Sequence, residues 1–253
     1  MALKISTGLR NFRAAEGSLR KAFEDGVLNV YSGTAPTEAD DAPTGVLLCK
    51  YTKSSGEVAA NARSTPQLLT VTISGTPDAG DVVKLLLDSG AQNYTLVTAD
   101  ATVALVALKV ARMLNDSQQV EAIATGTTGV IYVQARIAGV SFTLTENTST
   151  GITVAVSADI VANVAIDTLK LALPTAGVYT KNTDTWSGKA LITGVAGYGR
   201  FVTSLDLGTD NTTDVRMQGN VSTSGSEFDL SNINFTIGAT QTIDIFELTE
   251  PSA

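Results

Sequence analysis

The one Trp of this chain lies in residues 186–207, WSGKALITGVAGYGRFVTSLDL, where a glycine-rich corner joins two strand-like runs. The runs, residues 190–193 and 200–207, are rich in β-branched and apolar residues, and the corner glycines supply the backbone freedom that a bend requires. This pattern predicts a core hairpin around which the rest of the chain packs. We therefore expect a mainly β protein, an antiparallel β-sandwich of jelly-roll type.

Composition restricts the kinds of partner. The chain has 253 residues, of which 43% are hydrophobic, so it can build substantial cores. Its formal net charge of -8 argues against a surface that neutralises phosphates, and we expect no nucleic-acid partner. No uninterrupted apolar stretch is long enough for a membrane-spanning helix, and no secretory signal is visible, so we also expect no membrane insertion.

Catalytic side chains are scarce. The absence of His removes Ser-His-Asp, Cys-His and every other His-based mechanism, and the single Cys49 lies in an apolar run that predicts a small buried hydrophobe. Asp and Glu fall in loops or on polar strand faces, where solvated surface is the ordinary interpretation, although a paired-carboxylate site stays open. We expect no enzymatic activity and no cofactor.

One acidic segment allows two interpretations. Residues 206–214, DLGTDNTTD, concentrate oxygen-bearing side chains that could hold a calcium ion, with Asp206, Asp210, Asn211 and Asp214 as the candidate ligands. The spacing does not match an EF-hand, and Asp, Asn, Gly and Thr are also the residues of a plain hairpin turn. We favour the turn and expect no metal requirement.

Shifts in composition near residues 64 and 162 divide the chain. Residues 64–162 read as an inserted, smaller α+β domain of strands, one helix and further strands, with the helix at residues 101–114 and Asp100 as its cap. Residues 1–63 and 163–253 then form a discontinuous β-sandwich domain.

The clearest strand of the discontinuous domain is residues 214–221. Its strict alternation places Val215 and Met217 on the core face, while Arg216 and Gln218 belong to the face expected to meet water. Further on, Phe228 and Leu230 lie on one strand face at even-numbered positions, whereas the next apolar residues lie at odd-numbered positions. This change of parity predicts a bulge or break near residues 231–232.

The N-terminus is basic although the chain is acidic. Its first 21 residues hold five basic residues against one acidic residue, a local balance of +4 that leaves -12 for the remainder. A basic, partly helical arm of this kind suits docking to an acidic protein surface, including a second copy, but it is also what a solvated helix looks like. The candidate docking residues are Lys4, Leu9, Arg10, Phe12, Arg13, Leu19, Arg20, Lys21 and Phe23.

Both ends of the sequence resemble small virion structural proteins of tailed bacteriophages. The resembling motifs are the STGLRN start, the YSGTAP turn, the TDVRMQGNV strand followed by SGSEFDLSN, and the TIDIFELTEP ending. Residues 71–114, from VTISG to VARML, resemble a module that recurs in phage structural and surface proteins. No functional residues accompany these motifs.

The resemblance implies a virion protein, made in the cytoplasm of the host bacterium, that acts by multivalent attachment. It favours decoration or cementing of the head shell, with major capsid proteins as partners and a homo-oligomer as the assembled form. A position in the neck, collar or tail is the alternative within this class. From another class, a carbohydrate-binding or depolymerising β protein stays open, although few aromatic residues are present for sugar stacking.

Overall fold

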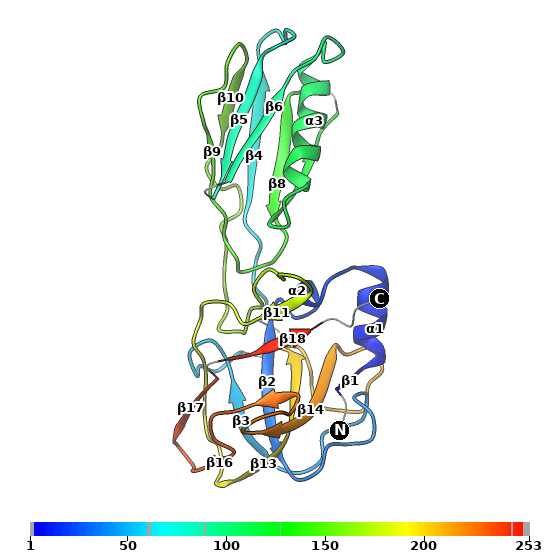
Figure 1. The fold of residues 1–253 in the computed structure, drawn as a ribbon, viewed down its shortest axis with the longest axis vertical. Helices are drawn as coiled ribbons and strands as arrows, with labels where there is room; N and C mark the ends of the chain where they lie inside the picture. The colour runs from blue at the N-terminus through cyan, green and yellow to red at the C-terminus, as the bar shows by residue number, and fades with distance from the viewer. Residues whose placement is uncertain (1–2, 60–61, 89, 127, 244, 250–253) are drawn as a thin grey trace. The chain divides into compact units, whose positions relative to one another are not determined.

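The computed structural model describes residues 3–59, 62–88, 90–126, 128–243 and 245–249. The protein is mainly β, its sheets are predominantly antiparallel, and three helices occur in the described residues (Figure 1). It consists of two compact units: unit 1 comprises Met1–Arg63 and Ile166–Ala253, and unit 2 comprises Ser64–Ala165. The boundary expected after residue 162 lies three residues before the observed one.

Unit 1 contains two short helices and the larger set of strands. Its elements are β1 (Lys4–Ile5), α1 (Thr7–Ala15), α2 (Leu19–Ala22), β2 (Gly26–Ser32), β3 (Leu47–Tyr51), β11 (Val178–Thr180), β12 (Trp186–Lys189), β13 (Gly194–Thr203), β14 (Arg216–Ser222), β15 (Phe228–Asp229), β16 (Asn234–Phe235), β17 (Thr240–Ile243) and β18 (Glu247–Thr249).

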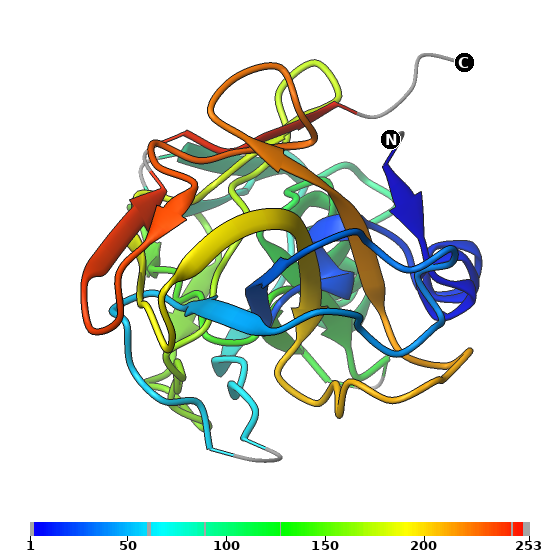
Figure 2. The ribbon, with the colours of Figure 1, turned by 90° about the horizontal axis from the view of Figure 1, so that it is seen from below.

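The main sheet of unit 1 has the order β1-β14-β13-β2-β3, and the curved β13 is visible beside β14 in Figure 2. All pairs along this path are antiparallel, whereas β15 adds to β14 in parallel. Two smaller ladders, β12 with β17 and β11 with β18, complete the unit. The antiparallel β architecture is confirmed; a jelly-roll connectivity stays a prediction.

The expected hairpin of residues 186–207 is wrong. β12 pairs with β17 and β13 pairs with β14, β2 and β16, so the two runs belong to different ladders. The first run was also misplaced, because the strand is Trp186–Lys189 while Leu191 and Ile192 are half exposed in the connection that follows. Trp186 itself is fully buried, as a core position requires, and stacks on Phe201 with ring centroids 5.8 Å apart.

The polar face of β14 is covered at Arg216 and Gln218, so the expectation that these two residues meet water is wrong. Arg216 and Gln218 are completely buried because a loop, residues 33–45, crosses over them; we call it the strap loop. Its carbonyl groups accept hydrogen bonds from the sheet below, from Gln218 to Pro36 at 2.9 Å and from Arg216 to Asp40 at 2.9 Å. Alternation correctly identified the two faces but could not show that a distant loop covers one of them.

The predicted parity break is confirmed in a specific form. Phe228 belongs to β15, which pairs with β14, whereas Phe235 belongs to β16, which pairs with β13. Both phenylalanines are buried in the same core. Between them, residues 230–233 form no strand, so the chain changes its partner strand there and the inward-facing parity changes with it.

Unit 2 comprises β4 (Leu68–Ser74), β5 (Val82–Leu87), β6 (Gly90–Thr95), α3 (Val103–Asn115), β7 (Val120–Ala124), β8 (Val130–Ala135), β9 (Leu144–Glu146) and β10 (Thr153–Val156). A four-stranded sheet of order β10-β4-β8-β7 and a three-stranded sheet of order β6-β5-β9 share one core with α3. The expected sequence of strands, helix and strands is present, with β7 as the strand that we did not predict.

The start of α3 differs from the expectation. Thr102 is the N-cap, since its hydroxyl accepts a hydrogen bond from the backbone N–H of Leu105. The Asp100 carboxylate has other donors, the Tyr94 hydroxyl at 2.6 Å and the backbone N–H of Val97 at 3.0 Å. Asp100 therefore ties the end of β6 to the connection before the helix rather than capping the helix.

Candidate functional site

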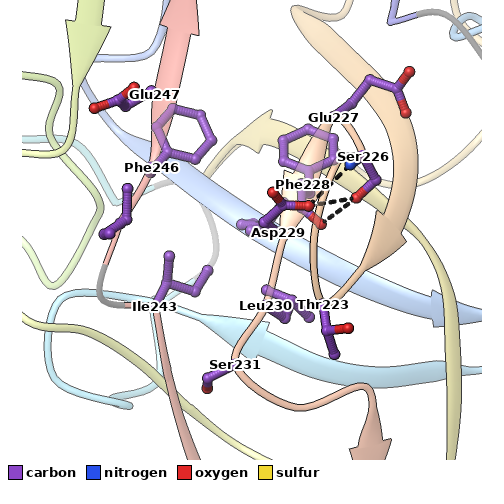
Figure 3. A pocket seen from close by; sticks show the side chains of 12 residues that line it. Thr223, Ser226, Glu227, Phe228, Asp229, Leu230, Ser231, Ile243, Phe246 and Glu247 are labelled. Carbon is purple, nitrogen blue, oxygen red and sulfur yellow. Dashed lines mark hydrogen bonds between the residues drawn. The ribbon is translucent and has the colours of Figure 1, made fainter.

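A cavity of about 430 Å³ opens in unit 1 between residues 223–231 on one side and residues 243 and 245–247 on the other (Figure 3). Its volume is in the range of ordinary ligand-binding pockets. Its described lining consists of Leu28, Thr223, Ser226, Glu227, Phe228, Asp229, Leu230, Ser231, Ile243, Ile245, Phe246 and Glu247. We call this the acidic pocket, because three lining residues are carboxylates and none of the described ones is Lys or Arg.

The floor of the acidic pocket is the outer edge of the aromatic core. Phe228 and Phe246 stack with ring centroids 6.2 Å apart, and Phe246 in turn contacts Trp186 at 4.9 Å. All three side chains are buried, whereas Ile245 at the mouth is 73% exposed. An occupant would therefore meet a rigid apolar surface below and a flexible aliphatic side chain at the entrance.

A tight turn in the sequence SGSEFDLSN places Phe228 and Asp229 in the acidic pocket. The Asp229 carboxylate accepts hydrogen bonds from the backbone N–H groups of Gly225 and Ser226, each at 3.0 Å, and also from the Ser226 hydroxyl (Figure 3). Gly225 adopts a φ of +76°, which a side chain would disfavour. The hydrogen bond from the Ser226 N–H is the main cause of the lowered pKa of Asp229, which keeps this carboxylate ionised.

The other two carboxylates are less constrained. One oxygen of Glu227 accepts the backbone N–H of Asn220 at 2.9 Å, so the side chain is anchored at the end of β14. Glu247 is exposed at the start of β18, on the opposite side of the mouth. Three negative charges around an apolar floor produce a local potential that attracts cations and repels anions.

The acidic pocket also borders an incompletely paired strand. In the part of the chain that the structure describes, β15 is paired with β14 alone, and residues 245–246, across the pocket, belong to no strand. Backbone groups of successive strand residues point to opposite sides, so those of Asp229 point away from β14. A strand edge of this kind can pair with an added extended segment.

Three of the predicted docking residues cannot form a docking surface in this structure. Leu9 and Phe23 are completely buried and Leu19 is 4% exposed, all three in the core of unit 1. The N-terminal segment is thus no free arm: Ser6 caps α1 and its hydroxyl also donates to the carbonyl of Asp214 at 2.7 Å. These apolar side chains instead belong to the core on which α1 and α2 pack.

The remaining predicted docking residues are dispersed. Arg10 and Arg13 are exposed on α1, and Phe12 is half-buried against the core. Arg20 donates to the carbonyl of Leu171 at 3.0 Å, and the Lys21 ammonium pairs with Glu24 at 2.6 Å.

The ammonium of Lys4 donates to the carbonyl of Thr37 in the strap loop. None of the nine predicted docking residues lines the acidic pocket. The positive charge at the N-terminus therefore divides between local contacts in unit 1 and two exposed arginines.

The acidic segment of residues 206–214 packs around the buried guanidinium group of Arg216. Arg216 donates to both oxygens of Asp206 at 2.8 Å and to the Asp214 carboxylate at 2.7 Å, and the Arg216 side chain has no exposed surface. Burial lowers the pKa of Arg216, but these two carboxylates outweigh burial and raise it. Two of the four candidate calcium ligands are therefore already paired with Arg216, and the segment is a loop fastened to the sheet. Among the described residues no group of three metal-ligating side chains occurs.

Cys49 is fully buried, in agreement with the interpretation of a small hydrophobe. Burial raises its pKa to about 12, so the group is a thiol at neutral pH. Gly188 packs directly on its sulfur, where a Cβ would come within 2.6 Å.

Sequence reasoning found neither the acidic pocket nor its charge. It assigned Phe228 and Leu230 to one strand face, but the pocket requires Ile243 and Phe246 from a segment beyond β16 to lie opposite them. The available signal was the SGSEFDLSN turn, whose Ser-Gly-Ser and Asp are typical of a side-chain-stabilised loop.

Comparisons of the chain with protein-family models and with curated proteins find no match. Among the described residues, no helix is long and apolar enough to cross a bilayer.

Proposed function

We propose that this chain is a non-enzymatic virion structural protein of a tailed phage that decorates or cements the head shell. One observation carries the proposal: the two compact units follow the division made by the sequence resemblance. The motifs that resemble small virion proteins lie in unit 1, and the VTISG to VARML segment that resembles a recurring phage module lies in unit 2.

Specific elements support this correspondence. The TDVRMQGNV motif supplies β14, the strand that joins β1 to β13, and the YSGTAP motif is the end of β2 and the start of the strap loop. The SGSEFDLSN motif forms the turn and β15 at the acidic pocket. The resembling segments therefore build the sheet of unit 1 and the site on it rather than scattered surface positions.

The chemistry of the described side chains suits attachment by surfaces. Arg216 is held by Asp206 and Asp214, and Lys170 pairs with Asp25 at 3.0 Å, so these buried charged groups stabilise the fold. The acidic pocket offers an apolar floor and fixed charges, which are the elements of a protein-binding site. Many weak contacts of this kind reach high avidity when copies bind side by side on a particle.

Immunogold electron microscopy of particles tests the location. Labelling over the head supports a decorating or cementing protein, whereas labelling at the neck, collar or tail favours the second virion position. Unlabelled particles, together with failure of the purified protein to co-sediment with particles that lack it, would reject the proposal as a whole.

The carbohydrate-binding alternative has limited support. Trp186 is fully buried and cannot stack on a sugar. Tyr132 on β8 is 45% exposed, next to the exposed Ile123 of β7, and is the described aromatic residue best placed for such stacking. A glycan array probed with the wild type and with Tyr132→Ala would reveal this activity, and its absence from the wild type would exclude it for the glycans tested.

A further inference from the structure

We propose that the acidic pocket of unit 1 binds an extended segment of another virion protein in which aliphatic side chains alternate with Lys or Arg. The inference names the partner chemistry of the attachment function proposed above and rests on that function for the identity of the partner. It is carried by the floor of the pocket, its charge and the strand edge beside it.

The floor selects apolar side chains. Phe228 and Phe246 form its aromatic part, and Leu230 and Ile243 add aliphatic surface that is almost completely buried. Burial of one leucine-sized side chain on such a surface contributes about 1.5–3 kcal/mol. A wholly polar ligand would forgo this contribution.

The charge selects cations beside those apolar groups. Asp229 stays ionised because the hydrogen bond from the Ser226 N–H lowers its pKa, and Glu227 and Glu247 stand on either side of the mouth. The Asp229 oxygens already accept three hydrogen bonds, so this carboxylate contributes charge more than a free ligand atom. Flexible ammonium or guanidinium groups at the rim fit this arrangement, whereas an acidic segment is repelled.

The strand edge selects an extended backbone. A peptide lying along β15 can use the backbone groups that point away from β14, and its side chains then alternate between the floor and the rim. An aliphatic residue followed by a basic one satisfies both surfaces in this geometry. A helix would present its apolar side chains three or four residues apart and could not pair with the edge.

A second copy of this chain does not supply such a segment from its basic N-terminus. There the exposed basic residues Arg10 and Arg13 lie on a helix, and Leu9 beside them is buried in the core. Extending this segment would unfold α1 and expose Leu9, so we assign the occupant to a different protein.

Peptide binding to the purified full chain tests the inference. The probe is the fluorescein-labelled hexapeptide TLKVKT, with TLEVET and TSKSKT as controls that change only the charge or only the apolar residues. Binding is followed by fluorescence anisotropy and by the emission of Trp186, the single Trp, which contacts Phe246 in the floor. We expect TLKVKT to bind at least tenfold more tightly than either control.

Two charge reversals provide the matched comparison. Glu247→Lys changes an exposed residue at the mouth, and Glu121→Lys makes the same change at an exposed position of β7 in unit 2. We expect Glu247→Lys to weaken TLKVKT binding about tenfold and Glu121→Lys to change it less than twofold.

Three results would overturn the inference: equal binding of TLKVKT and TLEVET, equal effects of the two reversals, or self-association of the protein that Glu247→Lys abolishes. The last result would mean that a second copy fills the acidic pocket. Peptide binding without labelling of the particle would reject the virion function alone, while labelled particles without peptide binding would reject the inference alone.

Discussion

Asn115 and Ala122 are joined by two hydrogen bonds, from the Asn115 side-chain nitrogen to the Ala122 carbonyl at 2.7 Å and from the Ala122 N–H to the Asn115 side-chain oxygen at 2.8 Å. The amide at the end of α3 therefore pairs with β7 as a neighbouring strand would. β7 is the outermost strand of its sheet, so this contact covers part of an edge that could otherwise pair with another chain.

Replacing Asn115 by Ala should destabilise unit 2. The change leaves the N–H and carbonyl of the buried Ala122 without these partners, which costs about 1–3 kcal/mol. Chemical denaturation followed by circular dichroism measures the effect. Asn93→Ala at an exposed position of β6 is the matched control and should stay within about 0.5 kcal/mol of the wild type. Equal stabilities of the two variants would show that the amide contact contributes nothing.

Asp100 should make the stability of unit 2 depend on pH. Its burial raises the pKa, but the Tyr94 hydroxyl, the Val97 N–H and Lys109 outweigh burial and lower it below the ordinary 3.8. A lowered pKa in the folded state means that the stabilisation is complete above that ordinary value and disappears as pH falls through the folded value. Asp100→Asn should therefore be less stable than the wild type at pH 7, and the difference should shrink below about pH 4. A pH-independent difference in thermal denaturation would contradict this assignment.

Arg216→Met should destabilise unit 1 strongly. The substitution retains much of the side-chain volume but leaves Asp206 without its partner in a buried position, and breaking a buried pair costs about 3–5 kcal/mol. Arg10→Met, at an exposed site on α1, should change stability by less than about 0.5 kcal/mol. Urea denaturation with Trp186 emission as the probe reports unit 1 directly.

Chelation should leave the protein unchanged. Since Arg216 forms ion pairs with both Asp206 and Asp214, residues 206–214 need no metal ion to hold these two carboxylates together. Thermal denaturation in EDTA and in excess calcium should give the same midpoint. A fall of several degrees in EDTA would restore the calcium interpretation of this segment.

Unit 1 should fold without unit 2. The chain enters and leaves unit 2 side by side, since Thr65 and Val164 exchange backbone hydrogen bonds of 2.8 and 3.1 Å, so a short linker can replace residues 64–165. Unit 1 carrying this linker should stay soluble and unfold cooperatively. Its Trp186 emission should remain that of a buried indole. An unfolded or insoluble product would show that unit 1 depends on the inserted unit.

Local signals predicted many elements of unit 2. The alternating and β-branched runs at residues 68–74 and 130–136 predict strands, and β4 and β8 lie there, because their inner faces pack on one core and their periodicity survives in the sequence. β7 was missed because VEAIA is short and its outer residue Ile123 is apolar although exposed, which blurs the alternation. The helix was predicted, but Asp100 was wrongly given as its cap, because the Asp100 carboxylate instead accepts a hydrogen bond from the Tyr94 hydroxyl.

In unit 1, local sequence pattern was enough to assign Trp186 and the apolar residues of β14 to a core, because burying apolar area requires these residues on one side of a sheet. Strand pairing and the covering of polar faces, in contrast, became visible only in the folded chain. The strap loop buries Arg216 and Gln218 through carbonyl acceptors far away in the chain, and the acidic pocket depends on Phe246 lying opposite Phe228. Hydrogen bonds and ring contacts between distant segments depend on the positions of those segments in space, and no local periodicity in the sequence records these positions.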